Sequence, residues 1–233
     1  MHLVVFDVDG TLTDTNEVDA ECFWRAAREV LRLPSDHPRW IEEVKNYTDL
    51  GIASQHCEAA FARAITAFEI DLIRNRRVTL LEAAVLMENE CIRPTRGAAS
   101  ALSALRAEPG FAVAIATGCF LASAEFKLRT ARLFDESIPI AGCDDATSRE
   151  EIMLNAARKA AVTYRLDFST VTYVGDGAWD VKAARHLGWN FIGVGAGDAA
   201  ERLLHAGAET VITDFEPATA FLDLLGKTAN RRQ

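Results

Sequence analysis

The chain has 233 residues, of which 49% are hydrophobic and 25% charged, and its formal net charge is −9. This balance is typical of one large folded domain, or of a domain with an insertion, and excludes collagen-like and disordered chains. The acidic charge argues against general binding to nucleic acid. No apolar run reaches the roughly 18 residues of a membrane helix, so we expect no membrane partner.

The N-terminus and the cysteines indicate a cellular location. The first ten residues, MHLVVFDVDG, carry no basic stretch ahead of their apolar run, so we expect no signal peptide. The five cysteines stand singly, and an odd, unclustered set is typical of reduced thiols rather than of disulfides or a zinc site. We therefore expect a cytoplasmic protein.

The first third of the chain contains one strand followed by helices. An apolar, β-branched run predicts a buried strand over residues 2–6. From about residue 15 the pattern is alanine-rich and helical, and a basic run that contains Arg77 is expected at a solvated helix end. The aromatic residues here mostly fall at helical spacings, which predicts that they form this segment's own core. The predicted helices are 17–32, 51–73 and 79–90, and the aromatic residues are Phe23, Trp24, Trp40, Tyr47, Phe61 and Phe68.

Strands and helices alternate after Pro94. This alternation predicts an α/β fold, a Rossmann-like, doubly wound parallel sheet with helices on both faces. The helical segment offers no strand to that sheet, so we expect residues 15–93 to form a separate helical domain inserted into a core made of 1–14 and 94–233. The predicted strands are 111–116, 138–141, 170–174, 190–194 and 210–212, and the predicted helices are 97–108, 121–132, 149–163, 179–187, 199–206 and 216–225.

Polar residues follow three of the predicted strands. In an open parallel sheet the carboxyl ends of the strands meet at one edge, and ligands bind there. Four carboxylates at one edge need a cation, and a set of oxygen ligands favours Mg²⁺. A carboxylate nucleophile, a metal and groups that bind anionic oxygens are the components of phosphoryl transfer through an aspartyl phosphate. The residues are Asp7 and Asp9, Thr117 and Gly118, and Asp176 and Asp180.

Three segments, FDVDGTLTDT, AIATG and YVGDGAWDVKAARHLG, carry a resemblance to the haloacid dehalogenase superfamily. The chain is most similar to the phosphatase branch with a helical cap after the first strand, which includes phosphoglycolate phosphatase and β-phosphoglucomutase. The resemblance implies that Asp7 is the nucleophile and that Asp9 is the general acid and then the base. It implies that Thr117 and Gly118 hold the phosphoryl group, and that the metal ligands are Asp7, Asp9 through its backbone carbonyl, Asp176 and Asp180.

The acid two residues after the nucleophile separates two chemistries within this superfamily. A halide leaves without a proton, whereas an alkoxide leaving group needs one. Asp9 therefore favours hydrolysis of a phosphate ester over dehalogenation.

One position departs from the family pattern, which usually has a lysine before the helix that follows the third core strand. The region reads GCDDATSREEIMLNAARKAA, and Arg149 is the best substitute. An arginine could neutralise Asp7 and bind phosphate through its fork of donors. Lys159 lies too far along the helix to be a good alternative. The competing interpretation makes Arg149 a surface residue paired with Glu150 or Glu151.

These features predict a Mg²⁺-dependent phosphatase that hydrolyses a small phosphorylated metabolite. The alternatives are a phosphomutase similar to β-phosphoglucomutase and, on the same fold, a binding protein without catalysis. Thr48, Asp49 and Gly51 are expected to form a loop that faces the site and sets specificity. The sequence leaves the oligomeric state open.

Overall fold

A six-stranded parallel sheet forms the centre of the computed structural model, which describes residues 1–41 and 43–230. The strand order is β5-β4-β1-β6-β7-β8, so β1 lies in the middle and is hydrogen-bonded to β4 and β6. All five residues of β1 are buried, as expected for an apolar strand covered on both faces. The strands are β1 His2–Phe6, β4 Phe111–Ala116, β5 Ile140–Ala141, β6 Thr170–Gly175, β7 Asn190–Val194 and β8 Val211–Ile212.

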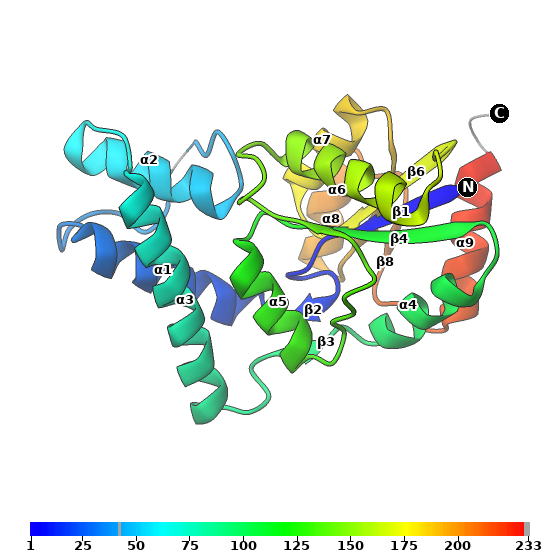
Figure 1. The fold of residues 1–233 in the computed structure, drawn as a ribbon, viewed down its shortest axis with the longest axis horizontal. Helices are drawn as coiled ribbons and strands as arrows, with labels where there is room; N and C mark the ends of the chain where they lie inside the picture. Colours follow the sequence, from blue (N-terminus) through cyan, green and yellow to red (C-terminus); the bar gives the residue numbers. More distant parts are fainter. Residues whose placement is uncertain (42, 231–233) are drawn as a thin grey trace.

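Helices cover both faces of this sheet. Figure 1 shows α6 and α7 on one side of the strands, and α4 and α9 on the other. The predicted α/β fold, a doubly wound parallel sheet with an inserted helical unit, is confirmed. The helices of this part are α4 Ala98–Ala107, α5 Leu121–Thr130, α6 Arg149–Tyr164, α7 Ala178–His186, α8 Asp198–His205 and α9 Ala218–Asn230.

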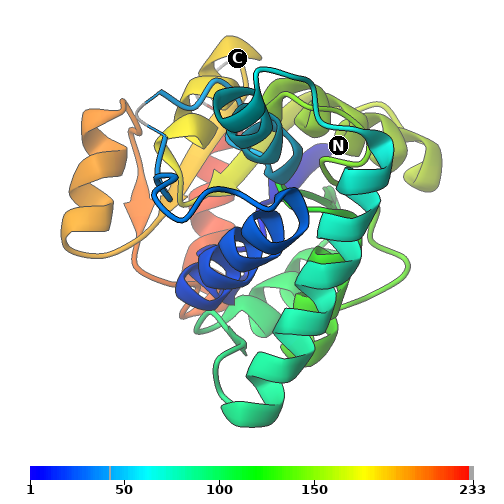
Figure 2. The same cartoon turned by 90° about the vertical axis from the view of Figure 1, so that its left-hand side faces the viewer.

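The remaining helices form a unit at one end of the molecule, away from the sheet (Figures 1 and 2). α1 packs along α3 and also contacts α2. The chain enters and leaves this unit through β2 and β3, a two-stranded antiparallel ladder that the sequence did not predict. We call α1–α3 and the loops between them the inserted helical unit. The elements are β2 Thr13–Asp14, α1 Asn16–Leu31, α2 Asp49–Phe61, α3 Ala67–Met87 and β3 Arg93–Pro94.

The predicted break between the second and third helices is wrong. α2 ends at Phe61, where the following Ala62 takes a left-handed conformation with φ 50°. α3 then begins with a capping box, in which Thr66 accepts from the backbone N–H of Glu69 and the Glu69 carboxylate accepts from the backbone N–H of Thr66. The basic run predicted to end a helix therefore lies inside α3, because the residues that end α2 and begin α3 precede it in the sequence.

The expectation that the basic run lies at a solvated helix end is wrong for Arg77. Its side chain is fully buried and forms ion pairs with Asp19 of α1 and Asp49 of α2. Arg74 and Arg76 also form ion pairs, with Asp144 and Glu29 respectively. These three arginines thus join α3 to α1, to α2 and to the core.

The aromatic residues of the inserted helical unit do not form its core as predicted. Phe23 is buried, but Trp40 and Phe68 are 72% and 71% exposed, and Tyr47 and Phe61 are also exposed. Helical spacing cannot place Trp40 and Tyr47, because both lie in the loop between α1 and α2.

Within the described residues, no helix combines the length and the apolar character needed to cross a membrane.

Candidate active site

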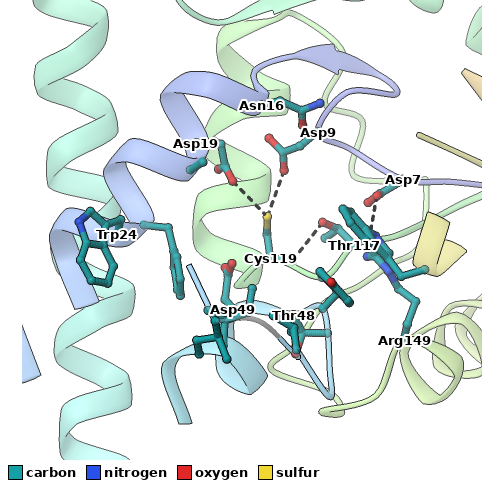
Figure 3. Close-up of a pocket in the computed structure, with 18 of the residues that line it drawn as sticks. Asp7, Asp9, Asn16, Asp19, Trp24, Thr48, Asp49, Thr117, Cys119 and Arg149 are labelled. Carbon is teal, nitrogen blue, oxygen red and sulfur yellow. Dashed lines mark hydrogen bonds and ion pairs between the residues drawn. The ribbon is translucent and has the colours of Figure 1, made fainter. Parts of the chain in front are cut away.

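The ends of β1, β4 and β6 place Asp7, Asp9, Thr117, Gly118 and Asp176 around one cavity of about 360 Å³ (Figure 3). Asp180, the sixth predicted residue, is fully buried and is not among the residues that line this cavity. Asp7 follows β1, and its backbone N–H donates to Val174 of β6 at 2.9 Å. Thr117 follows β4, and its N–H donates to Ala141 of β5 at 3.0 Å. The parallel register therefore aligns these strand ends, and Asp176 after β6 reaches the same cavity.

Three carboxylates lie close enough to hold a cation. Oxygen atoms of Asp7, Asp176 and Asp180 all lie within 4.8 Å of one another. Burial, reinforced by the charge of Asp7, raises the pKa of Asp176 to about 7. Burial also raises the pKa of Asp7. Asp7 and Asp180 each pair with Arg149, whereas Asp176 has no ion-pair partner among the described residues. A further cation would offset the remaining charge, and the oxygen-only donor set fits Mg²⁺.

Gly10 allows the loop after β1 to pass this acidic group. Its φ is +68°, and a Cβ atom at this position would lie 2.0 Å from Oδ2 of Asp176. Any side chain would therefore displace Asp176, whose Oδ2 also accepts a hydrogen bond from Asn16 at 2.9 Å.

Arg149 begins α6 and is buried beside Asp7. Its Nη2 donates to Oδ2 of Asp7 at 3.1 Å, and its Nε lies 2.9 Å from Oδ1 of Asp180. The alternative of a surface residue paired with Glu150 or Glu151 is wrong for this reason.

The second terminal nitrogen of Arg149, Nη1, is buried without a hydrogen-bond partner. It lies where a Cβ atom on Gly118 would approach it at 3.0 Å. A buried donor of this kind costs free energy unless an acceptor occupies the space in front of it, and a phosphoryl oxygen is such an acceptor. Lys159 lies elsewhere, bonded to Asp145 and to the carbonyl of Ile140.

Lys127 is a residue of this site that the sequence analysis missed. It lies in α5 with its side chain fully buried, and its Nζ donates to both carboxylate oxygens of Asp9, at 2.7 and 2.6 Å. Asp9 also accepts from the hydroxyl of Thr15 and, at 3.0 Å, from the thiol of Cys119. Burial opposes ionisation of Asp9, but the ammonium of Lys127 dominates and lowers its pKa to about 2.

A sequence signal for Lys127 exists. The buried face of α5 also contains Ser123, Ala124 and Leu128, which lie at helical spacings from Lys127. A lysine inside such a stripe of small and apolar residues must find a buried acidic partner.

Lys127 also connects the core to the inserted helical unit. Its Nζ bonds Asp19 of α1, which in turn pairs with Arg77 of α3. A second group of side chains, Asp9, Asp19 and Cys119, also lies close enough together to hold a metal ion. The ammonium of Lys127, however, already contacts all three of these side chains. These residues therefore form a buried ion-pair network, and the cation at its centre is Lys127.

The loop before α2 lies against the core beside the cavity. The Thr48 hydroxyl donates to the carbonyl of Thr147 at 2.9 Å, and the Asp49 N–H donates to the carbonyl of Gly118 at 2.8 Å. The ring of Tyr47 stacks on that of Trp179, with centroids 4.4 Å apart. Thr48 and Asp49 thus form part of the cavity wall, with side chains already bonded to the protein.

Gly51, the third residue predicted for specificity, is not among the residues that line the cavity. Its N–H donates to the hydroxyl of Thr48 at 3.1 Å at the start of α2. A Cβ atom here would lie 2.5 Å from the carbonyl oxygen of Asn46. Its small size therefore allows the loop to pack closely.

We expect Mg²⁺ to raise the melting temperature more at about pH 8 than at about pH 5.5. Because the pKa of Asp176 is raised to about 7, the metal-free folded state holds a proton that the unfolded state releases, and stability falls as pH rises from about 4 to 7. Bound Mg²⁺ removes this penalty. At saturation the shift at high pH should be roughly 4 °C or more, measured by thermal unfolding with Mg²⁺ or EDTA. Equal shifts at both pH values would contradict this electrostatic account.

Comparisons with known proteins agree with this geometry. A model of haloacid dehalogenase-like hydrolases matches residues 1–188. A hydrolase from Pseudomonas syringae has a similar structure, with a TM-score of 0.72 at 23% identity over 96% of this chain and 99% of that one. The search of curated proteins gives no match.

Two further solved structures share the fold. A candidate β-phosphoglucomutase from Bacteroides vulgatus has a TM-score of 0.68 at 18% identity, covering 99% of this chain and 91% of that one. A predicted phosphoglycolate phosphatase from Haemophilus somnus has a TM-score of 0.60 at 18% identity, covering 94% and 97%. The resemblance seen in the sequence is confirmed: this chain belongs to the haloacid dehalogenase-like hydrolase family.

Proposed function

We propose that this hydrolase is a Mg²⁺-dependent phosphatase that cleaves a small phosphomonoester through an aspartyl phosphate on Asp7. The observation that carries the proposal is the contact of Asp7 with Arg149, whose second nitrogen is buried and unpaired beside Gly118. A nucleophilic carboxylate and an unused donor at one cavity are the requirements for binding and attacking a phosphoryl group.

In the first step, an oxygen of Asp7 attacks phosphorus, and the bond from phosphorus to the alcohol oxygen breaks. The Thr117 hydroxyl, the Gly118 N–H and Arg149 bind the phosphoryl oxygens. The Thr117 oxygen already accepts from the N–H of Cys119 at 3.1 Å, so its own proton is free for the substrate. Asp7, Asp176 and Asp180 would hold Mg²⁺, which when bound offsets the negative charge of the carboxylates and the phosphoryl group.

Asp9 acts next to this centre. As a carboxylate it is ready to take a proton from the water that hydrolyses the aspartyl phosphate. The departing alkoxide needs a proton in the first step. In the site without substrate Lys127 does not supply it, because Asp19 and Asp9 raise the pKa of Lys127 against the effect of burial, and the ammonium keeps Asp9 ionised. The negative charge of a bound phosphate ester would raise the pKa of Asp9, which would then carry a proton from solvent to the alkoxide. Asp9 therefore serves both proton transfers.

We expect Arg149→Ala to lower phosphate release from p-nitrophenyl phosphate by roughly 10²–10³-fold, as loss of a preorganised donor does in other enzymes. Arg149→Lys should retain more activity than Arg149→Ala, because an ammonium can still neutralise Asp7. The assay compares the purified variants with and without Mg²⁺. Arg158→Ala, an exposed arginine on the same helix, is the matched control and should leave the rate unchanged.

Two results of this assay would count against the proposal. A rate for Arg149→Ala equal to that of the Arg158→Ala control would remove the phosphate-binding role of Arg149. Rearrangement of a sugar phosphate without release of inorganic phosphate would instead identify a phosphomutase.

A further inference from the structure

The wall of the cavity opposite the carboxylates is apolar and aromatic. It comes from α1, from the loop that follows it and from α2, and Figure 3 shows Trp24 on this side of the cavity, away from Asp7. Trp40 lines this wall although it is 72% exposed, and large exposed apolar groups beside a cavity typically mark a binding surface. The residues of the apolar wall are Phe23, Trp24, Trp40, Ile41, Val44 and Ile52.

The acidic groups on the same side are already paired with the protein. Asp19 bonds Arg77 and Lys127. Asp49 bonds Arg77 and accepts from the N–H of Phe120 at 2.8 Å. Because both carboxylates already accept hydrogen bonds from the protein, they do not require a hydroxyl group of the substrate as a partner.

The basic groups on this side are also paired. His56 is buried, shares a hydrogen bond of 3.0 Å with His37, and has its pKa lowered to about 4 by burial and by His37, so it is neutral near pH 7. Arg39 pairs with Glu21 at 2.8 Å and lies over the ring of Trp40.

Apart from Arg149, two residues that line the cavity have an N–H donor without a hydrogen-bond partner among the described residues, namely Arg39 at Nε and Trp179 at Nε1. They can serve one or two acceptors on a ligand, but not the ring of hydroxyls on a sugar. A sugar enclosed by this wall would lose its hydration without regaining its hydrogen bonds.

We propose that the substrate of this site is the phosphate monoester of a largely apolar alcohol, aromatic or branched, rather than a sugar phosphate. The proposal rests on the phosphatase function proposed above and names the leaving group. The cavity of about 360 Å³ is within the range of small-molecule pockets, so it has room for an apolar body beyond the phosphate.

The test compares 2-phenylethyl phosphate with glucose 6-phosphate, using the full-length protein and Mg²⁺. Both are esters of primary alcohols that contain a six-membered ring, but the sugar ring carries hydroxyls and the phenyl ring carries none. We expect kcat/KM to be at least about 100-fold higher for 2-phenylethyl phosphate, because several hydroxyls of the sugar remain unpaired. p-Nitrophenyl phosphate serves as the reference for the chemical step.

Two variants assign this preference to the wall. Val44→Thr and Ile52→Thr each place a hydroxyl on it and should lower kcat/KM for 2-phenylethyl phosphate by about 5–10-fold, with little change for glucose 6-phosphate. Val162→Thr, at an exposed valine of α6, is the matched control and should behave as the wild type.

The outcomes separate the two proposals. Equal or better hydrolysis of glucose 6-phosphate would overturn the apolar substrate class and leave the phosphatase function intact. If no ester is hydrolysed, the phosphatase function is wrong, and a binding measurement then tests whether the apolar wall binds an apolar group. By calorimetry, 3-phenylpropylphosphonate should bind at least about 30-fold more tightly than inorganic phosphate. Equal binding of the two would overturn the inference.

Discussion

Replacing Asp7 by Asn is expected to lower phosphate release by at least about 10⁴-fold, as removal of a catalytic nucleophile does in other enzymes. The amide keeps the shape of the side chain but is a poor nucleophile, and it cannot neutralise the buried guanidinium of Arg149. The measurement is the Mg²⁺-dependent rate with p-nitrophenyl phosphate, with folding checked by circular dichroism.

Asp14→Asn is the control for this substitution. Asp14 lies seven residues further along the same segment, is exposed and pairs with Arg93 outside the cavity. Its variant should retain the wild-type rate. A folded Asp7→Asn protein whose rate stays within tenfold of the wild type would exclude Asp7 as the nucleophile.

Lys127→Met is expected to lower the free energy of unfolding by about 3–5 kcal/mol, because removing one partner of a buried ion pair leaves the other charge uncompensated. Asp9 would lose its only ion-pair partner among the described residues, whereas Asp19 would still reach Arg77. Urea denaturation monitored by tryptophan fluorescence measures the change.

Lys182→Met gives the comparison, since Lys182 is exposed on α7, and its free energy of unfolding should stay within about 0.5 kcal/mol of the wild type. The same small effect for Lys127→Met would show that the network does not stabilise the fold. Addition of Mg²⁺ should not restore the lost stability, because the carboxylates proposed to hold the metal lie outside this network.

The sheet could be predicted from the sequence because its central strands are short apolar runs bounded by polar residues. β1, β4 and β7 have the predicted bounds, and β6 is one residue longer. The bounds of the edge strands could be predicted less accurately, since β5 comprises only Ile140–Ala141 within the predicted 138–141. The β2–β3 ladder could not be found, because two residues per strand carry no periodicity.

The bounds of α2 and α3 in the inserted helical unit could not be predicted from the sequence. Ala62, which ends α2 in a left-handed conformation, is a good helix former and gives no stop signal. The charged residues near Arg77 give a false stop, because their partners on α1 and α2 are distant in sequence.

The part of the site at the strand ends could be predicted because parallel topology brings strand ends together. That rule places Asp7, Thr117 and Asp176 at one cavity without knowledge of any side-chain contact. The partner of Asp9 follows no such rule, since Lys127 comes from the buried face of a helix 118 residues away. The buried stripe of α5 marks Lys127 as a lysine that needs an acidic partner, but which carboxylate it meets depends on packing that a single sequence does not reveal.

The most direct test of the account is a rapid-quench experiment with enzyme in excess over substrate and Mg²⁺ present. Samples quenched in acid during the single turnover are digested with a protease, and the mass of the peptide that contains Asp7 is measured by mass spectrometry. We expect this peptide to gain a phosphoryl group that hydroxylamine removes, and the Asp7→Asn protein to gain none. Release of phosphate in the same samples while the Asp7 peptide stays unmodified throughout would contradict it.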